Sequence, residues 1–152
     1  MKTIFSALKE LCKQEGWDLT ELVDGKEAMI EFKDVDNVVW SCFAYARENQ
    51  KQFVFYSIRF DDVPISSIHA VNELITRINY GLAIGNFEMN LDKGTVRFKT
   101  SFDFDITEPT SDMLAPLIYA NITIMGNFLP ALDEVAEGKI SAQEAYNSIK
   151  LR

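Results

Sequence analysis

The segment from Met113 to Val135 carries apolar residues at helical spacing around most of its circumference. Its apolar rows are Leu114, Ile118, Met125, Phe128 and Leu132, and beside them Met113, Leu117, Ala120, Ile124, Ala131 and Val135. A surface helix of a small domain needs only one apolar stripe. Contiguous exposed apolar patches larger than a few hundred Å² are uncommon on monomers. The sequence therefore predicts that the rest of the domain, or another protein chain, covers this helix.

The length and composition favour one domain that spans residues 1–152. A chain of 152 residues with 47% apolar and 12% aromatic residues can bury a sizeable core, and it is too apolar to be disordered. It has no apolar run of about 20 residues without polar interruption, which argues against a membrane span. Its first residues lack the continuous apolar stretch of a secretory signal. We expect a cytoplasmic protein with no membrane partner.

Net charge and cysteine content exclude further classes of function. The formal net charge is −8 and the pI is near 4.6, so the chain repels a phosphate backbone, and we expect no nucleic-acid partner. The two cysteines, Cys12 and Cys42, have no CxxC spacing. We interpret them as buried apolar residues.

Apolar periodicity and turn residues predict the order of the elements. The predicted elements are a helix over 2–15, strands over 19–33, 38–47 and 52–60, a helix over 64–81, strands over 84–91 and 95–104, a helix over 112–137 and a short helix over 141–149. Asp24-Gly25 is a strong turn signal, so the first strand segment can also be two short strands. Pro130 predicts a kink between Gly126 and Pro130. Ser141 and Glu144 form a capping box for the last helix.

The titratable residues do not form a catalytic or metal-binding pattern. His69 is the only histidine, which excludes a multi-histidine metal site. Carboxylate pairs occur at Asp34/Asp36, Asp61/Asp62 and Asp103/Asp105. None of these pairs continues into a calcium-loop sequence. We therefore expect no catalytic residue, no metal and no cofactor, and we expect that the protein is not an enzyme.

Two segments carry a resemblance to a known family. They are Val71-Asn72-Glu73-Leu74 through Ile78-Asn79, and Gly85 to Met89 followed by Leu91-Asp92-Lys93-Gly94-Thr95-Val96. In this order of elements they resemble the YbjN-like family of bacterial proteins, described as sensory transduction regulators, over residues 10 to 137. The resemblance implies a type III secretion chaperone-like fold, usually a homodimer that binds other polypeptides and catalyses no reaction.

These observations predict an α+β domain with a single antiparallel sheet of about five strands in the order α-β-β-β-α-β-β-α(-α). We expect the first and the long helix to pack on a dry sheet face that contains Phe98, Phe102 and Phe104, with Arg97, Lys99 and Asp103 on the wet face.

The preferred hypothesis for function is a chaperone-like or regulatory adaptor that forms a homodimer and binds an unidentified client polypeptide. Its predicted interface residues are Ile118, Ile122, Met125, Phe128, Leu129, Ile68 and Ile75. One alternative is an enzyme or small-ligand receptor with a pocket at the kinked helix, where Asn121, Thr123 and Asn127 supply polar groups. Another is a monomeric regulator that binds a polypeptide at a sheet edge.

Overall fold

The computed structural model describes residues 2–33 and 36–150, and in this part of the chain it is an α+β fold with one antiparallel sheet. The strands are β1 (Leu19–Val23), β2 (Glu27–Lys33), β3 (Val39–Arg47), β4 (Gln52–Ile58), β5 (Asn86–Met89) and β6 (Val96–Asp103). The α-helices are α1 (Ile4–Glu15), α2 (Ile68–Tyr80), α3 (Ser111–Ala136) and α4 (Ala142–Lys150), with short 3-10 turns at Glu48–Gln50 and Ile65–Ser67. The predicted fold class is thereby confirmed.

The sheet has six strands, one more than the sequence predicted. The predicted strand over 19–33 is two strands, because the chain reverses at Asp24-Gly25, where Gly25 has a φ of 62°. A positive φ is easily adopted only by glycine, so the turn forms there without strain. The predicted break from Asp34 to Asn37 lies partly outside the described residues.

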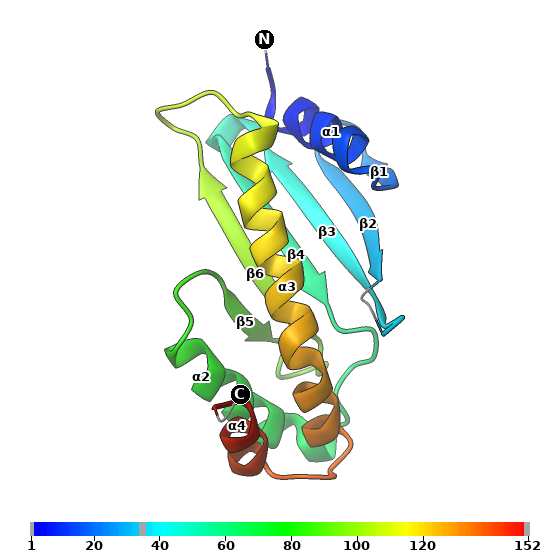
Figure 1. Cartoon of the computed structure of the whole chain (residues 1–152), viewed down its shortest axis with the longest axis vertical. Helices are drawn as coiled ribbons and strands as arrows, with labels where there is room; N and C mark the ends of the chain where they lie inside the picture. The colour runs from blue at the N-terminus through cyan, green and yellow to red at the C-terminus, as the bar shows by residue number, and fades with distance from the viewer. Residues whose placement is uncertain (1, 34–35, 151–152) are drawn as a thin grey trace.

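The strand order in the sheet is β1-β2-β3-β4-β6-β5, and all neighbours are antiparallel. The first four strands form a meander. The chain then leaves the sheet through α2 and returns as the β5–β6 hairpin, with β6 placed beside β4. Figure 1 shows α1 and α3 crossing one face of this sheet, and α2 and α4 gathered at one end of it.

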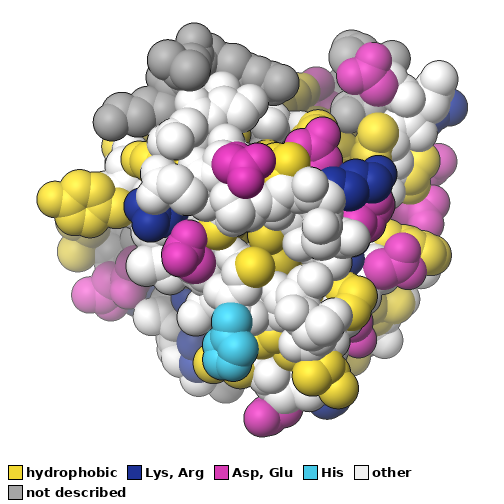
Figure 2. All heavy atoms as spheres, turned by 90° about the horizontal axis from the view of Figure 1, so that it is seen from below, with side chains coloured by type: hydrophobic (Ala, Val, Ile, Leu, Met, Phe, Trp, Pro, Cys, Tyr) yellow, Lys and Arg dark blue, Asp and Glu magenta, His cyan; other side chains and the backbone are white. Residues whose placement is uncertain are grey.

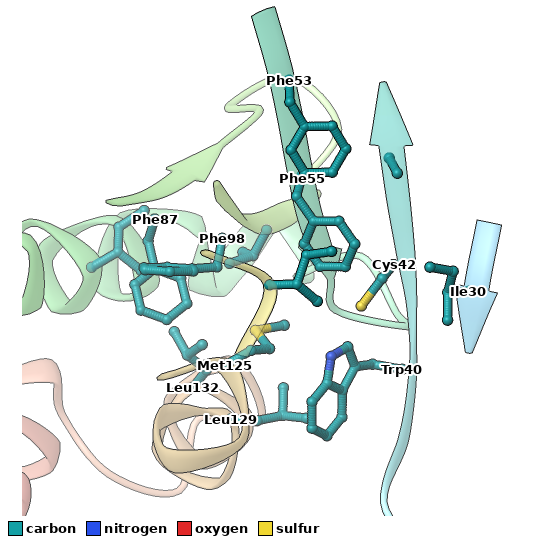
Figure 3. Packing of buried hydrophobic residues seen from close by; sticks show 14 of the residues in the cluster. Ile30, Trp40, Cys42, Phe53, Phe55, Phe87, Phe98, Met125, Leu129 and Leu132 are labelled. Atoms are coloured by element: carbon teal, nitrogen blue, oxygen red, sulfur yellow. The ribbon is translucent and has the colours of Figure 1, made fainter. Parts of the chain in front are cut away.

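The core lies between the sheet and α3. Phe53 and Phe55 of β4 and Phe98 of β6 are fully buried on the side that faces the helices. Figure 3 shows Trp40, Met125 and Leu129 packed together in this layer. Phe104, just beyond β6, is buried as predicted, but Phe102 is 39% exposed, because it lies near the end of β6 that α3 covers incompletely.

The long helix buries one row of residues against its own chain, and its other apolar residues are partly exposed. α3 runs without interruption through Pro116 and Pro130, and Thr110 caps its first turn by accepting a hydrogen bond from the Met113 N–H. Its buried residues are Ser111, Leu114, Ile118, Asn121, Met125, Leu129, Leu132, Val135 and Ala136. By length and composition alone α3 could also cross a membrane, and 28% of the stretch that meets this criterion is buried inside the fold; a single such helix is weak evidence for a membrane span.

The last helix closes one end of the core. α4 packs against both α2 and α3, and it buries Ala142 and Ala145. Of the predicted capping box, the structure shows the bond in which the Glu144 N–H donates to Ser141 Oγ at 3.1 Å, and the Ser141 hydroxyl in turn donates to Glu144 Oε1. Seen from this end, apolar side chains lie scattered among polar ones rather than in one patch (Figure 2).

Candidate functional site

Most residues predicted to form an interface on the helices belong to the protein's own core. Ile118 and Met125 have no exposed surface, and Leu129, Ile68 and Ile75 are buried as well. The prediction for these five is corrected, because their side chains already pack against the sheet and the neighbouring helices. Ile122 and Phe128 are half-buried at the rim of the core.

The face of the sheet opposite the helices is uncovered. Side chains alternate along each strand, so Trp40, Cys42, Ala44 and Ala46 of β3 face the helices. The side chains between them face away from the helices, and the same holds for the other strands. We call this surface the open face. All described side chains on it are at least partly exposed, and no helix packs on it (Figure 1).

The middle of the open face is apolar and aromatic. We define the central strip as Phe43, Tyr45, Val54, Tyr56 and Ile58. The pairing register places Phe43 directly beside Tyr56, and Tyr45 beside Val54. The rings of Tyr45 and Tyr56 meet edge-on, with centroids 5.7 Å apart. All five side chains are half-buried, because they shield one another laterally while their outer surfaces remain open. The strip is therefore an apolar patch whose outer surface no described helix covers.

Both flanks of the central strip carry charged side chains. Glu27 and Glu31 lie on β2, on one side of the strip, and Lys33 follows at the end of that strand; we call this side the acidic flank. Arg97 and Lys99 lie on β6, on the other side, where the sequence placed the wet face. The guanidinium carbon of Arg97 stands 4.0 Å from the centroid of the Tyr56 ring, so the basic flank contacts the strip directly.

Glu88 of β5 lies at the outer edge of the basic flank. Its carboxylate accepts a hydrogen bond from Arg97 Nε at 2.9 Å and another from Lys99 Nζ at 3.0 Å. Partial burial alone would raise the pKa of Glu88, but hydrogen bonding and attraction from Lys99, together with Arg97, outweigh it and hold the pKa below its ordinary value. Asp103, at the far end of β6, adds a second carboxylate to this flank, so its positive charge is local to Arg97 and Lys99.

The alternative pocket at the long helix has a structural counterpart. A cleft of about 360 Å³ lies beside α3 and contacts β2 and β3. Its lining residues are Phe32, Lys33, Asp36, Trp40, Ile122, Thr123, Gly126 and Asn127. Thr123 and Asn127 therefore lie where the pocket hypothesis placed them. Asn121 does not, because it is fully buried and hydrogen-bonded within the core.

Neither cysteine has the environment of a catalytic nucleophile. Burial raises the pKa of the Cys12 thiol to about 11 and that of the Cys42 thiol to about 12, which disfavours the nucleophilic thiolate. His69 is exposed on α2, where Figure 2 shows its imidazole in cyan. Within residues 2–33 and 36–150, no three His, Cys, Asp or Glu side chains are close enough to hold a metal ion. Asp34 lies outside these residues.

The open face was not recognised from the sequence as a candidate site. β3 reads Val-Trp-Ser-Cys-Phe-Ala-Tyr-Ala-Arg, which is apolar on both faces, and β4 is similar. Such a pattern indicates two covered faces as readily as one. The signal that could have revealed the face is β6, which alternates cleanly and therefore has one wet side.

Comparisons with known proteins identify no relative. No protein-family description, no curated protein and no solved structure matches the chain. The resemblance to the YbjN-like family therefore stays a prediction.

Proposed function

We propose that the protein is a non-enzymatic protein-binding module, a chaperone-like or regulatory adaptor that acts as a cytoplasmic homodimer. One observation carries the proposal: the exposed central strip on the open face. Tyrosine, phenylalanine and arginine, which gather there, are enriched in the buried centres of protein interfaces. The interface is proposed on the open face rather than on α3, because Ile118, Met125 and Leu129 of α3 are buried inside the fold.

Particle mass and client capture test this proposal with one pair of variants. The double variant Phe43→Ser/Tyr56→Ser removes two aromatic rings from the strip without touching the core. Tyr80→Ser is the matched control, because Tyr80 is 94% exposed at the end of α2, away from the sheet face. Light scattering should give twice the 17.3 kDa chain mass for the natural chain and the control, and a shift toward one chain for the double variant.

Client capture, the second measurement, distinguishes the homodimeric adaptor from the monomeric regulator. Affinity capture from the native cell should recover the same polypeptides with the natural chain and with Tyr80→Ser. A single-chain mass with undiminished client capture would replace the homodimer with the monomeric regulator. A single-chain mass without any specific client would overturn the proposal.

The cleft beside α3 favours a second candidate, a receptor for a small ligand. Its volume falls in the range of ligand pockets, and it combines an aromatic floor from Phe32 and Trp40 with polar groups from Thr123 and Asn127. A metabolite screen by thermal shift tests it, with Ile122→Trp as the variant that fills the cleft. A ligand that raises the melting temperature of the natural chain but not of Ile122→Trp would favour this candidate.

A further inference from the structure

We infer that the open face binds the open face of a second copy of this chain, about a twofold axis parallel to the strands between β3 and β4. This inference rests on the proposed homodimer and adds its geometry. The axis places β2 of one copy over β6 of the other. It also places Phe43 over Tyr56 of the second copy, so that the central strips meet at the middle of the interface.

The charge pattern of the open face favours a second copy of this chain as its binding partner. The register aligns Glu31 of β2 with Ser41 of β3, Ile58 of β4 and Arg97 of β6 in one row across the sheet. A rotation about the strand direction reverses the order of strands and keeps each residue in its row. Glu31 of each copy therefore lies over Arg97 of the other, twice in the dimer. A face that meets itself must be self-complementary in this way.

The same pattern excludes the other twofold arrangement of two stacked sheets. An axis across the strands would keep β2 over β2 and β6 over β6. Glu27 and Glu31 would then face the acidic flank of the second copy, and Arg97 and Lys99 would face its basic flank. Like charges opposed at an interface cost several kcal/mol. Only the axis along the strands brings the acidic flank onto the basic one.

The size of the open face suits a dimer interface. Six strands spaced about 4.8 Å apart and about seven residues long cover roughly 700 Å² in projection. A standard interface buries about 800 Å² on each partner. Two sheets stacked face to face with nearly aligned strands are also the arrangement of β-sandwiches.

Self-cross-linking at the ends of β3 tests the direction of the axis. Arg47 and Val39 stand at opposite ends of β3, both exposed on the open face. With the axis along the strands, equal positions of the two copies are separated by one strand spacing and one sheet spacing, about 11 Å in all. With the axis across the strands, Arg47 lies over Val39, and equal positions are about 27 Å apart.

The experiment uses Arg47→Cys and Val39→Cys separately, with a bis-maleimide matched to the sheet spacing. The natural chain is the background control, because Cys12 and Cys42 are buried. We expect a covalent dimer from each variant alone. Cross-linking only in a mixture of the two variants would overturn the axis and leave the homodimer standing. A light-scattering dimer with no cross-link in any sample would overturn the open face as its interface.

Charge reversal on the acidic flank tests the pairing of Glu31 with Arg97. Glu31 is exposed, so Glu31→Lys does not disturb the core. We expect the dissociation constant of the dimer to rise about tenfold or more with Glu31→Lys, and less with Glu31→Gln. Glu134→Lys makes the same change of charge on α3 and should leave it unaltered. Equal dissociation constants for Glu31→Lys and Glu134→Lys would overturn the pairing, whereas a monomeric natural chain would overturn the homodimer itself.

Discussion

Ser57 of β4 donates a hydrogen bond of 2.6 Å from its Oγ to Oδ1 of Asn121 on α3, and both side chains are fully buried. The Asn121 amide nitrogen lies 3.1 Å from the carbonyl oxygens of Phe55 and Phe98. Trp40 Nε1 donates to the same Ser57 Oγ at 3.1 Å. One amide on the long helix therefore joins it to two neighbouring strands, in a core where unpaired polar groups are costly.

We predict that Asn121→Ala lowers the free energy of unfolding by about 3 kcal/mol, because it leaves the Ser57 hydroxyl without its acceptor and removes a donor from the strand carbonyls. Urea denaturation measures the loss. Asn127→Ala is the control, since Asn127 is exposed one to two turns further along α3, and we expect a change within about 0.5 kcal/mol. Equal effects of the two substitutions would contradict the role of Asn121.

Gly126 sits where α3 passes closest to Trp40. A Cβ added at Gly126 would lie 3.3 Å from Cη2 of the Trp40 ring. We predict that Gly126→Ala changes stability by less than about 1 kcal/mol, because the helix gains propensity while the contact tightens. Gly126→Val should cost about 1 to 3 kcal/mol through overpacking. Thermal unfolding of the pair checks this, and a valine variant as stable as the alanine variant would show that the contact is looser than described.

The buried thiols predict a slow reaction with alkylating agents. Since burial raises the pKa of Cys42 to about 12 and that of Cys12 to about 11, very little thiolate is present at pH 8. We expect iodoacetamide to modify neither cysteine in the folded protein, and both after unfolding in urea, as measured by intact mass. Rapid labelling of the folded chain would place a thiol at the surface.

The ion pairs of Glu88 predict a dependence of stability on pH. The pKa of Glu88 is lowered in the folded state, so its contribution is present above its pKa in the unfolded chain, about 4.3, and is lost as the pH falls through the lower folded value. Glu88→Gln should therefore be less stable than the natural chain at pH 7. The difference should shrink as the pH falls below the unfolded value of about 4.3 and through the lower pKa of the folded state. Urea titrations at pH 7 and at acid pH measure it, and a constant difference would mean that the charge of Glu88 contributes nothing.

Local sequence signals predicted the elements well. Turn and capping residues act within a few positions, which is why Ser141 caps the start of α4 and the chain reverses at Asp24-Gly25, as predicted. The alternation in β6 also predicted which face is wet. Each of these features depends on residues within its own segment, so it could be predicted without the tertiary structure.

The candidate site could not be predicted in the same way. α3 has more apolar residues than one buried stripe needs. The sequence does not show whether the sheet, α2 and α4 of the same chain pack against them or whether another chain does. Ile118 and Met125 therefore looked like interface residues and are core residues. Conversely, nothing in the sequence pattern distinguishes Phe43 and Tyr56 on the open face from Phe53 and Phe55 in the core, because periodicity along a strand does not reveal which side a helix will cover.

The position of β6 between β4 and β5 also bears on how the chain is made. During synthesis the meander of β1 to β4 leaves the ribosome first, with one edge of β4 unpaired until residues 96–103 arrive. Unpaired edges of nascent sheets invite association with other chains. Chaperones that act on newly made polypeptides would therefore have their main opportunity in that interval, before the hairpin closes the edge and α3 seals the core.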